Sequence, residues 1–333
     1  MKITFFEVQD WEKEALSRAF PEATLLADKL NNNTDITDKL QGVEIISTFI
    51  NSEVNGTVMQ KIPSLKFIVT RSTGFDHIDV PFARSKSIIV SNVPEYGSNT
   101  VAEHTFALIL SLSRKIYQSV SQSKNLNFDH SLIRGVDLNG KTIGILGLGK
   151  IGINVLKIAS GFGMKALVYN RSTNESLAKK YDFNYATLEE VLKNSDFITL
   201  HLPLTVETKY IINETNILLL KRGSFLVNTA RGGLVKTEAI IMALNEGVLA
   251  GAALDVLEEE KELSEEVAIL TSEFRDSVDL KNLVYNHILI NHPKVLITPH
   301  NAFNSEEALD RITKTTINNI NSFMKGNPIN LID

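Results

Sequence analysis

The chain contains no cysteine, which excludes disulfides, zinc–thiolate sites and thiol catalysis. No apolar run reaches the roughly 18 residues that a membrane-spanning helix needs, so no membrane partner is expected. The net charge of −5 argues against binding to a nucleic-acid backbone, which requires a basic surface. The first residues show no signal-peptide pattern, and we expect a cytoplasmic protein without a bound metal.

A length of 333 residues is too great for one average domain, so two domains are expected. Short apolar runs alternate with amphipathic stretches, a pattern that predicts an α/β fold with parallel sheets covered by helices. The predicted strands are Ile3–Val8, Ile45–Phe49, Phe67–Thr70, Ile88–Val90, Thr142–Leu146, Ala166–Tyr169, Phe197–Leu200, Ser224–Asn228, Gly251–Leu254 and Val295–Ile297.

Two features set the expected domain boundaries. A long helix is predicted over Thr100–Lys115, directly after a turn-like stretch with Pro94 and Gly97, and it suits a connector between domains. The chain is expected to cross back near 293–299 and to end in a helix. We therefore expect residues 1–99 plus 300–333 to form one discontinuous domain and residues 100–299 the other. Residues 261–292 are expected to form an excursion with one or two helices.

A glycine loop follows the predicted strand Thr142–Leu146. Gly147, Gly149 and Gly152 form the pattern G-x-G-x-x-G, and a helical stretch comes next. The first glycine allows a tight turn, the second lets the backbone approach a pyrophosphate, and the third allows close helix–strand packing. Three spaced glycines alone also suit a structural turn. Their place between a strand and a helix favours a Rossmann-type dinucleotide site.

The strand that follows the glycine loop ends at Asn170, where an NAD-selective site usually has Asp or Glu. Without that carboxylate nothing repels a 2′-phosphate, and Arg171 could pair with one. The other interpretation of Arg171 is a solvated loop residue. The sequence thus predicts NAD(H) and leaves NADP(H) open.

Three ionisable side chains lie just beyond the carboxyl ends of predicted strands, where open α/β sheets bind ligands. They are Arg231 in Asn228-Thr229-Ala230-Arg231-Gly232-Gly233, Glu260 at the end of Asp255-Val256-Leu257-Glu258-Glu259-Glu260, and His300 in Thr298-Pro299-His300-Asn301. Taken singly, each has a plainer interpretation: the acidic run as a solvated turn, the histidine as a structural loop residue, the arginine as a surface charge.

Several long motifs in order, with these three segments, resemble the D-isomer-specific 2-hydroxyacid dehydrogenases over nearly the whole chain. The further landmarks are Arg71-Ser72-Thr73-Gly74-Phe75-Asp76-His77-Ile78-Asp79, Val101-Ala102-Glu103-His104 and His201-Leu202-Pro203-Leu204-Thr205. The resemblance implies a Rossmann-type domain for the dinucleotide and a smaller flavodoxin-like substrate domain. It also implies a homodimer built around the helix that begins near Thr100.

The resemblance gives each ionisable residue a catalytic role. Arg231 matches the arginine that binds the substrate carboxylate, for which its planar fork of donors is suited. His300 matches the proton donor to the carbonyl oxygen, and Glu260 matches its carboxylate partner. An adjacent carboxylate favours the charged form of an imidazole. His77 and His104 do not match the proton donor of the family and are expected to be structural, and His201 begins a cofactor-side loop in the family pattern.

The resemblance also assigns binding residues. Substrate binding is carried over to Ser72, Thr73, Gly74, Tyr96 and Phe303. Cofactor binding is carried over to Thr100, Gly147, Gly149, Lys150, Ile151, Gly152, Asn170, Arg171, Leu202, Pro203, Thr208, Thr229, Ala230 and Asp255, the last beside the nicotinamide carboxamide.

Two aromatic residues favour the D-lactate dehydrogenase branch. Tyr96 and Phe303 match residues that line an apolar pocket for a small group such as the methyl of pyruvate. Asn170 and Arg171, however, are more typical of glyoxylate and hydroxypyruvate reductases. A third interpretation is an NAD(H)-sensing corepressor, a binding protein of the same fold that can keep the three ionisable residues.

Overall fold

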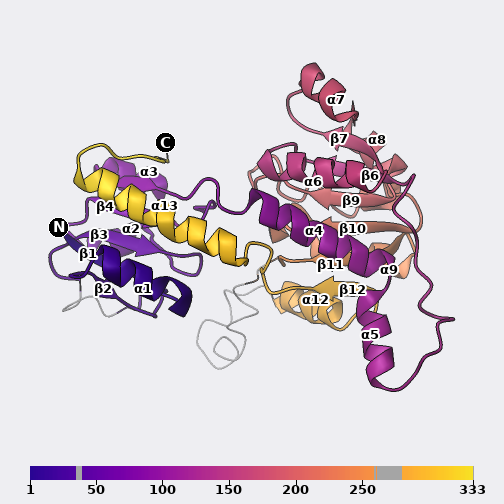
Figure 1. Cartoon of the computed structure of the whole chain (residues 1–333), viewed down its shortest axis with the longest axis horizontal. Coiled ribbons are helices and arrows are strands. Elements are labelled where there is room, and N and C mark those ends of the chain that lie inside the picture. Colours follow the sequence, from indigo (N-terminus) through magenta and orange to yellow (C-terminus); the bar gives the residue numbers. More distant parts are fainter. Residues whose placement is uncertain (35–39, 259, 261–279, 333) are drawn as a thin grey trace. The chain divides into compact units, whose positions relative to one another are not determined.

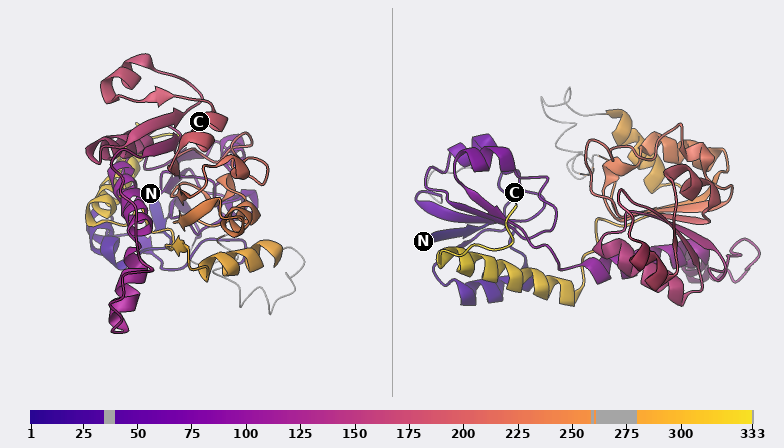
Figure 2. Two further views of the ribbon diagram at one scale, coloured as in Figure 1. Left: turned by 90° about the vertical axis from the view of Figure 1, so that its right-hand side faces the viewer. Right: turned by 90° about the horizontal axis from the view of Figure 1, so that it is seen from above.

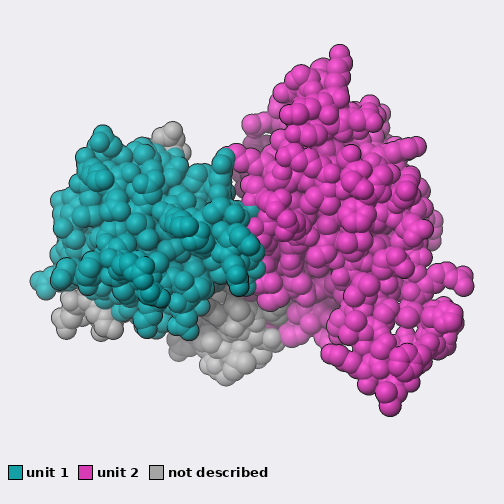
Figure 3. Space-filling view, in the orientation of Figure 1, with its two compact units in different colours: residues 1–97, 304–333 teal, residues 98–303 magenta. Residues whose placement is uncertain are grey.

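The structure is a computed structural model that describes residues 1–34, 40–258, 260 and 280–332. It divides into two compact units, Met1–Gly97 with Asn304–Asp333 and Ser98–Phe303 (Figure 3). Each unit contains one parallel sheet with helices on its faces, so the predicted α/β class is confirmed. No helix in the described ranges is long and apolar enough to cross a membrane.

The sheet of the first unit has the order β2-β1-β3-β4-β5, and its described strand pairs are all parallel. Helices α1 and α13 cover one face through Leu16 and Ile320, and α2 and α3 cover the other through Val58 and Ala83 (Figures 1 and 2). The elements are β1 Lys2–Phe5, α1 Asp10–Ala19, β2 Thr24–Leu25, β3 Val43–Thr48, α2 Gly56–Gln60, β4 Phe67–Thr70, α3 Val80–Ser85, β5 Ile89–Ser91 and α13 Glu306–Met324.

The sheet of the second unit has the order β12-β11-β10-β9-β6-β7-β8. The elements are α4 Ser98–Ser113, α5 Ile116–Lys124, β6 Thr142–Leu146, α6 Lys150–Gly161, β7 Lys165–Tyr169, α7 Glu175–Tyr181, β8 Asn184–Tyr185, α8 Leu188–Asn194, β9 Phe197–Leu200, η1 Ile217–Leu219, β10 Ser224–Asn228, η2 Gly232–Leu234, α9 Thr237–Asn245, β11 Leu249–Leu254, α12 Leu280–Ile290 and β12 Val295–Ile297.

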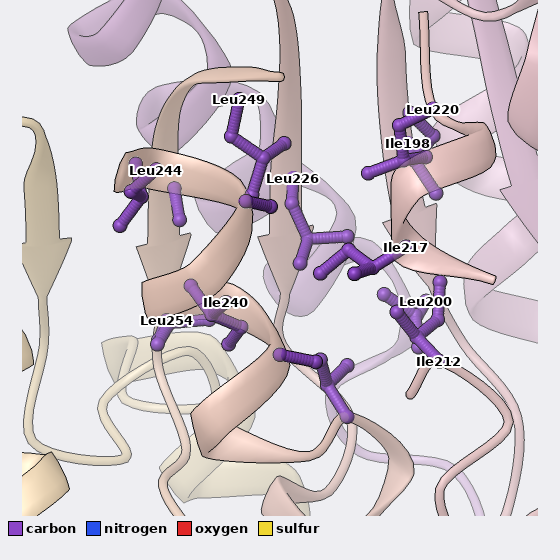
Figure 4. Packing of buried hydrophobic residues seen from close by; sticks show 14 of the residues in the cluster. Ile198, Leu200, Ile212, Ile217, Leu220, Leu226, Ile240, Leu244, Leu249 and Leu254 are labelled. Atoms are coloured by element: carbon purple, nitrogen blue, oxygen red, sulfur yellow. The ribbon is translucent and has the colours of Figure 1, made fainter. Parts of the chain in front are cut away.

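Buried side chains alternate between the two faces of this sheet, as the two-residue period of a strand requires. Leu226 packs against α8 and α9, whereas its neighbour Val227 packs against α4 and α6. Figure 4 shows the first of these clusters, in which side chains of β9, β10 and β11 meet Ile240 and Leu244 of α9. Both faces of the sheet are therefore buried, which explains the continuous apolar runs in these strands.

The division into units differs by a few residues from the expected domain boundaries. The second unit begins at Ser98 instead of residue 100, because α4 starts there. It ends at Phe303 instead of residue 299, so His300 belongs to it. The reason is local bonding, since the N–H of His300 donates to the carbonyl oxygen of Asp255 at 2.9 Å.

Some elements differ from the sequence prediction. The first strand ends at Phe5 instead of Val8, because Glu7 has a left-handed backbone (φ 55°). The short strands β2 and β8 were not predicted. In the predicted excursion 261–292, α12 is a helix as expected, and residues 261–279 lie outside the described residues.

Candidate active site

The three ionisable residues singled out by the sequence follow neighbouring strands of one sheet. Strand β11 pairs with β10 on one side and with β12 on the other, and all three are parallel. Arg231 follows β10, Glu260 follows β11 and His300 follows β12. Because the carboxyl ends of parallel strands meet at one edge, the structure brings these residues to the same edge of the second unit.

His300 and Glu260 form a direct pair. His300 Nδ1 lies 3.3 Å from Glu260 Oε2, and both side chains are about one-third exposed (34% and 35%). The pair leaves the other ring nitrogen, Nε2, as the one that can act on a ligand. A carboxylate that accepts from Nδ1–H orients the imidazole and fixes a proton on Nδ1, so that Nε2 is the nitrogen that faces a ligand. This arrangement suits an acid or base at a solvent-accessible site.

Asp255 holds the backbone around His300 in place. Its carboxylate accepts hydrogen bonds from the Thr298 hydroxyl at 2.5 Å and from the N–H groups of Asn301 at 2.8 Å and Ala302 at 2.9 Å. His300 has a left-handed backbone (φ 50°), which few residues other than glycine adopt. A buried carboxylate therefore stabilises an unfavourable turn that presents the histidine.

The environment of Asp255 keeps it ionised. Burial by itself raises the pKa of Asp255, but hydrogen bonding from His104, Thr298 and the backbone outweighs burial, and the pKa is lowered. His104 Nε2 lies 3.4 Å from Asp255 Oδ1 and 3.3 Å from the Thr298 hydroxyl. The histidine on α4 thus contacts the group that holds the His300 turn.

Arg231 lies in a turn that is braced by Asn228, a residue only 1% exposed. The side chain of Asn228 accepts the N–H of Ala230 at 3.0 Å and donates to the carbonyl oxygen of Arg231 at 2.9 Å. The next residue, Gly232, packs so closely that a Cβ there would lie 2.0 Å from the carbonyl oxygen of Leu257. Only glycine fits there, and the turn rests on the segment that leads to Glu260.

The acidic run is not a solvated turn throughout, because Glu258 is buried (6% exposed). Its carboxylate accepts hydrogen bonds from the Tyr210 hydroxyl and from the N–H and hydroxyl of Thr237, at 3.0 and 2.9 Å. Sequence reasoning missed this residue. Its partners lie 48 and 21 residues away along the chain, and no local pattern signals them.

The glycine loop connects β6 to α6, and the strand order of the sheet reverses between β6 and its neighbour β9, which is where open α/β folds bind ligands. Gly147 has φ 102°, and a Cβ there would lie 2.8 Å from the backbone of His201. A Cβ on Gly152 would lie 2.2 Å from the carbonyl oxygen of Gly147. Gly149, in contrast, has no heavy atom within 4 Å of a Cβ position.

These glycines fit a dinucleotide. Gly149 is the N-cap of α6. No heavy atom lies within 4 Å of the position that a Cβ would take, so the space beside this glycine can receive a phosphate. No side chain caps α6, and no acidic residue stands in its first turn. The positive N-terminal end of α6 is therefore not neutralised by a carboxylate of its first turn, which suits the binding of a pyrophosphate. Lys150 and Ile151 open this helix.

Asn170 connects the end of β7 to the glycine loop. Its amide oxygen accepts the N–H of Leu148 at 3.0 Å, and its amide nitrogen donates to the carbonyl oxygen of Ser172 at 2.8 Å. Arg171 is exposed, and its positive charge contributes, after hydrogen bonding from Thr205, to the lowered pKa of Glu207. The position that is expected to select between the cofactors therefore carries an amide and a cation, with one carboxylate in electrostatic contact.

The loop after β9 carries Leu202, Pro203 and Thr208. The Thr208 hydroxyl donates to the carbonyl oxygen of Pro203 at 2.6 Å, which closes the loop. At its start, Nε2 of His201 lies 3.0 Å from the Thr199 hydroxyl, and burial lowers the pKa of His201 to about 3. The imidazole beside the glycine loop is therefore neutral at physiological pH.

The remaining cofactor residues predicted from the sequence also lie in the second unit. Thr100 is in α4, and Thr229 and Ala230 follow β10. The Thr229 hydroxyl is within 2.9 Å of the Thr105 hydroxyl, which ties this turn to α4. Across the described ranges, no group of three or more His, Asp or Glu side chains is arranged to hold a metal ion.

Four of the five predicted substrate residues lie in the first unit. Ser72 donates to the carbonyl oxygen of Gly74 at 2.6 Å, and Thr73 donates to that of Val93 at 2.8 Å, so the loop after β4 is fixed by its own side chains. The carbonyl oxygen of Tyr96 accepts a bond from Arg311 at 2.7 Å. The fifth residue, Phe303, is half-buried and ends the second unit.

Comparison with known proteins agrees with this geometry. The sequence profile "D-isomer specific 2-hydroxyacid dehydrogenase, NAD binding domain" matches residues 106–302. The "2-hydroxyacid dehydrogenase homolog 1" of Schizosaccharomyces pombe is 34% identical over 336 residues, covering 98% of this chain and 97% of that protein. The glyoxylate reductase of Pyrococcus furiosus is 34% identical over 328 residues, covering 96% of this chain and 87% of that protein.

A solved structure is similar along the whole chain. The D-lactate dehydrogenase of Aquifex aeolicus, complexed with NAD and lactic acid, superimposes with a TM-score of 0.86 at 35% identity and covers 98% of this chain and 96% of its own. The profile and the full-length relatives, together with the residues at the carboxyl edge, lead to one conclusion. The chain belongs to the family of D-isomer-specific 2-hydroxyacid dehydrogenases.

Proposed function

We propose that this protein catalyses the reversible reduction of a small 2-keto acid to a D-2-hydroxy acid, with pyruvate and D-lactate as the preferred pair. The observation that supports the reaction type is the pairing of His300 with Glu260 at 3.3 Å, on the sheet edge that also carries Arg231. The D-lactate dehydrogenase that superimposes on the chain supports the choice of substrate.

In this proposal each residue has a defined task. Arg231 binds the carboxylate of the keto acid through two of its N–H groups. A nicotinamide cofactor, when bound by the glycine loop, would supply the hydride for the carbonyl carbon. His300 donates the proton to the carbonyl oxygen as the negative charge develops there, and Glu260 orients the imidazole through Nδ1. A positioned acid of this kind is worth about 10²–10⁴ in rate.

The binding residues carried over from the family complete the proposal. Ser72, Thr73, Gly74 and Tyr96 in the first unit and Phe303 in the second are assigned to the substrate. The glycine loop and the loop after β9 are assigned to NAD(H). NADP(H) is a second cofactor, because Asn170 carries no negative charge and Arg171 can pair with a 2′-phosphate.

A second candidate is the reduction of glyoxylate or hydroxypyruvate. The amide and cation at Asn170 and Arg171 favour it, as does the similarity to the glyoxylate reductase of Pyrococcus furiosus. Both candidates use the same catalytic group and differ only in the side chain of the keto acid.

We also propose that the protein is a homodimer. Large apolar side chains are exposed on α5 and the loop after it: Tyr117 is 67%, Phe128 76%, Leu132 79% and Leu126 83% exposed. An exposed apolar surface of this kind usually marks a protein–protein interface. Sedimentation equilibrium of the wild type and of Phe128→Glu tests this proposal, with a dimer expected for the former and a weakened dimer for the latter.

The proposed reaction is tested by steady-state assays of pyruvate, glyoxylate, hydroxypyruvate and phenylpyruvate against NADH and NADPH between pH 5 and 9. We expect the highest kcat/KM with pyruvate and a D product by chiral chromatography. A preference for glyoxylate or hydroxypyruvate would favour the second candidate. Cofactor binding without turnover of any keto acid would favour the NAD(H)-sensing corepressor instead.

A further inference from the structure

We propose that Glu258, together with Tyr210, is a positioning residue that fixes Arg231 and Glu260 relative to each other. The proposal rests on the function proposed above and adds residues to it that do not touch the substrate. It follows from the position of one buried carboxylate, which belongs to the segment after β11 and accepts hydrogen bonds from the segments after β9 and β10.

The first contact is made by Tyr210, which links the segment after β9 to those after β10 and β11. The hydroxyl of Tyr210 donates to Glu258 Oε1, and the N–H of Tyr210 donates to the carbonyl oxygen of Gly233 at 2.8 Å. Gly233 is two residues beyond Arg231. Tyr210 therefore bonds with its hydroxyl to the carboxylate and with its backbone to the arginine turn.

The second contact holds the far end of the same turn. Glu258 Oε2 accepts both the N–H and the hydroxyl of Thr237, the first residue of α9, at 3.0 and 2.9 Å. A carboxylate at a helix N-terminus also interacts favourably with the helix dipole. The stretch from Arg231 to Thr237 is thus bound to Glu258 at its end and, through Tyr210, near its beginning.

The third contact concerns the segment that carries Glu260. The side chain of Asn286 on α12 donates to the carbonyl oxygen of Glu258 at 2.8 Å, and Asn286 is 1% exposed. The close packing of Gly232 on Leu257 and Glu258 adds a direct contact between the two segments. The backbone two residues before Glu260 is consequently fixed to α12 and to the arginine turn.

Burial makes this arrangement sensitive to the carboxylate. Removing the Glu258 side chain takes away the acceptor shared by the Tyr210 hydroxyl and by Thr237, whose buried N–H loses its hydrogen bond, and both segments are then free to move. Glutamine at this position retains an acceptor for Thr237 and can still meet the Tyr210 hydroxyl. It is therefore the conservative variant that should rescue function.

The experiment compares Glu258→Ala, Glu258→Gln, Tyr210→Phe and the double variant Glu258→Gln/Tyr210→Phe, with Glu246→Gln on the exposed surface as the matched control. Measured are kcat and KM for the keto acid from pH 5 to 9, the Kd of NADH, and the Kd of oxamate, a pyruvate analogue that reports on Arg231. Circular dichroism checks that each variant is folded.

We expect Glu258→Ala to lower kcat/KM by about 10–100-fold, to weaken oxamate binding and to change the pH profile, with the Kd of NADH within about twofold of wild type. Glu258→Gln should recover most of the loss. Tyr210→Phe should lower kcat/KM several-fold. The free-energy loss of the double variant should not exceed the sum of the two single losses, and its difference from that sum should be measurable.

A folded Glu258→Ala with wild-type kinetics, oxamate affinity and pH profile would overturn the proposal. If that variant does not fold, the proposal is tested with Glu258→Gln and Tyr210→Phe. Unchanged kinetics in both folded variants, with no coupling in the double variant, would also overturn the proposal. A lower melting temperature alone would indicate a purely structural role, which also contradicts it. Inactivity of the wild type towards every keto acid would instead refute the proposed function.

Discussion

The amide oxygen of Asn170 accepts the backbone N–H of Leu148 at 3.0 Å, so the residue at the end of β7 is bonded directly to the glycine loop. Its amide nitrogen donates to Ser172, which orients the amide and fixes which end faces the loop. The residue that is expected to select the cofactor is thus part of the loop that is expected to bind the pyrophosphate.

This relationship predicts the effect of Asn170→Asp. The carboxylate can still accept the N–H of Leu148, so the loop should persist, but its charge repels a 2′-phosphate. We expect kcat/KM with NADPH to fall at least about tenfold, because two like charges near a protein surface repel by several kcal/mol. Activity with NADH should stay near wild type. An unchanged ratio of the two cofactors would show that Asn170 does not select between them.

The glycine loop allows binding and folding to be separated. Gly149→Ala meets no heavy atom within 4 Å and has an ordinary backbone (φ −79°), so stability should change by less than about 1 kcal/mol. The new methyl group would occupy the space expected for the pyrophosphate, and NADH binding should weaken markedly. Gly152→Ala places a Cβ 2.2 Å from a carbonyl oxygen and should destabilise the fold by about 1–3 kcal/mol.

Urea unfolding and calorimetric titration with NADH check both variants. Gly149→Ala with normal NADH affinity would contradict the assignment of the loop to the cofactor. Gly152→Ala with wild-type stability would contradict the close packing of α6 on β6.

His300 is expected to be the proton donor. His300→Ala should lower kcat about 10²–10⁴-fold, since that is the usual contribution of a positioned acid, with the Kd of NADH nearly unchanged. Stopped-flow reduction and fluorescence titration measure the two quantities. His130→Ala, in an exposed loop of the same unit, is the matched control. Normal turnover of the His300 variant would require another acid.

His201 predicts a dependence of stability on pH. Burial lowers its pKa from 6.5 to about 3 in the folded protein. Between these values the unfolded chain binds a proton that the folded protein does not, so the contribution of His201 is complete above about pH 6.5 and is lost as the pH falls, by up to about 1.4 kcal/mol per pH unit. Urea unfolding at pH 7.5, 6 and 5 should show a smaller loss for His201→Asn than for wild type. Equal losses would mean that the imidazole is protonated in the folded protein.

Much of the fold could be predicted from the sequence, because buried parallel strands form apolar runs and the turns between them contain glycine and proline. Strands β4 and β9 have the predicted bounds, since both begin and end at changes in polarity. The two-residue strands β2 and β8 were missed, because a pairing that short at a sheet edge leaves no periodic pattern.

The site was predicted in a similar way. The glycine loop is recognisable from its local motif, whereas the three ionisable residues are recognisable only together with the other family motifs in order. The pairing of all of them with ligands remains a prediction. The burial of Glu258 could not be foreseen, since it depends on Tyr210 and on the start of α9. The early end of β1 has the same origin: Glu7 turns to accept the N–H groups of Phe49 at 3.0 Å and Ser52 at 3.0 Å, more than forty residues away.

The left-handed backbone of His300 (φ 50°) means that the residue type favoured for stability at this position differs from the one expected to be needed for activity. Asparagine adopts this conformation more readily than histidine does, so a chain selected only for stability would favour His300→Asn. That substitution would remove the imidazole that pairs with Glu260. Screens for a more thermostable form of this protein should therefore enrich inactive variants at position 300, and they need an activity measurement at every round.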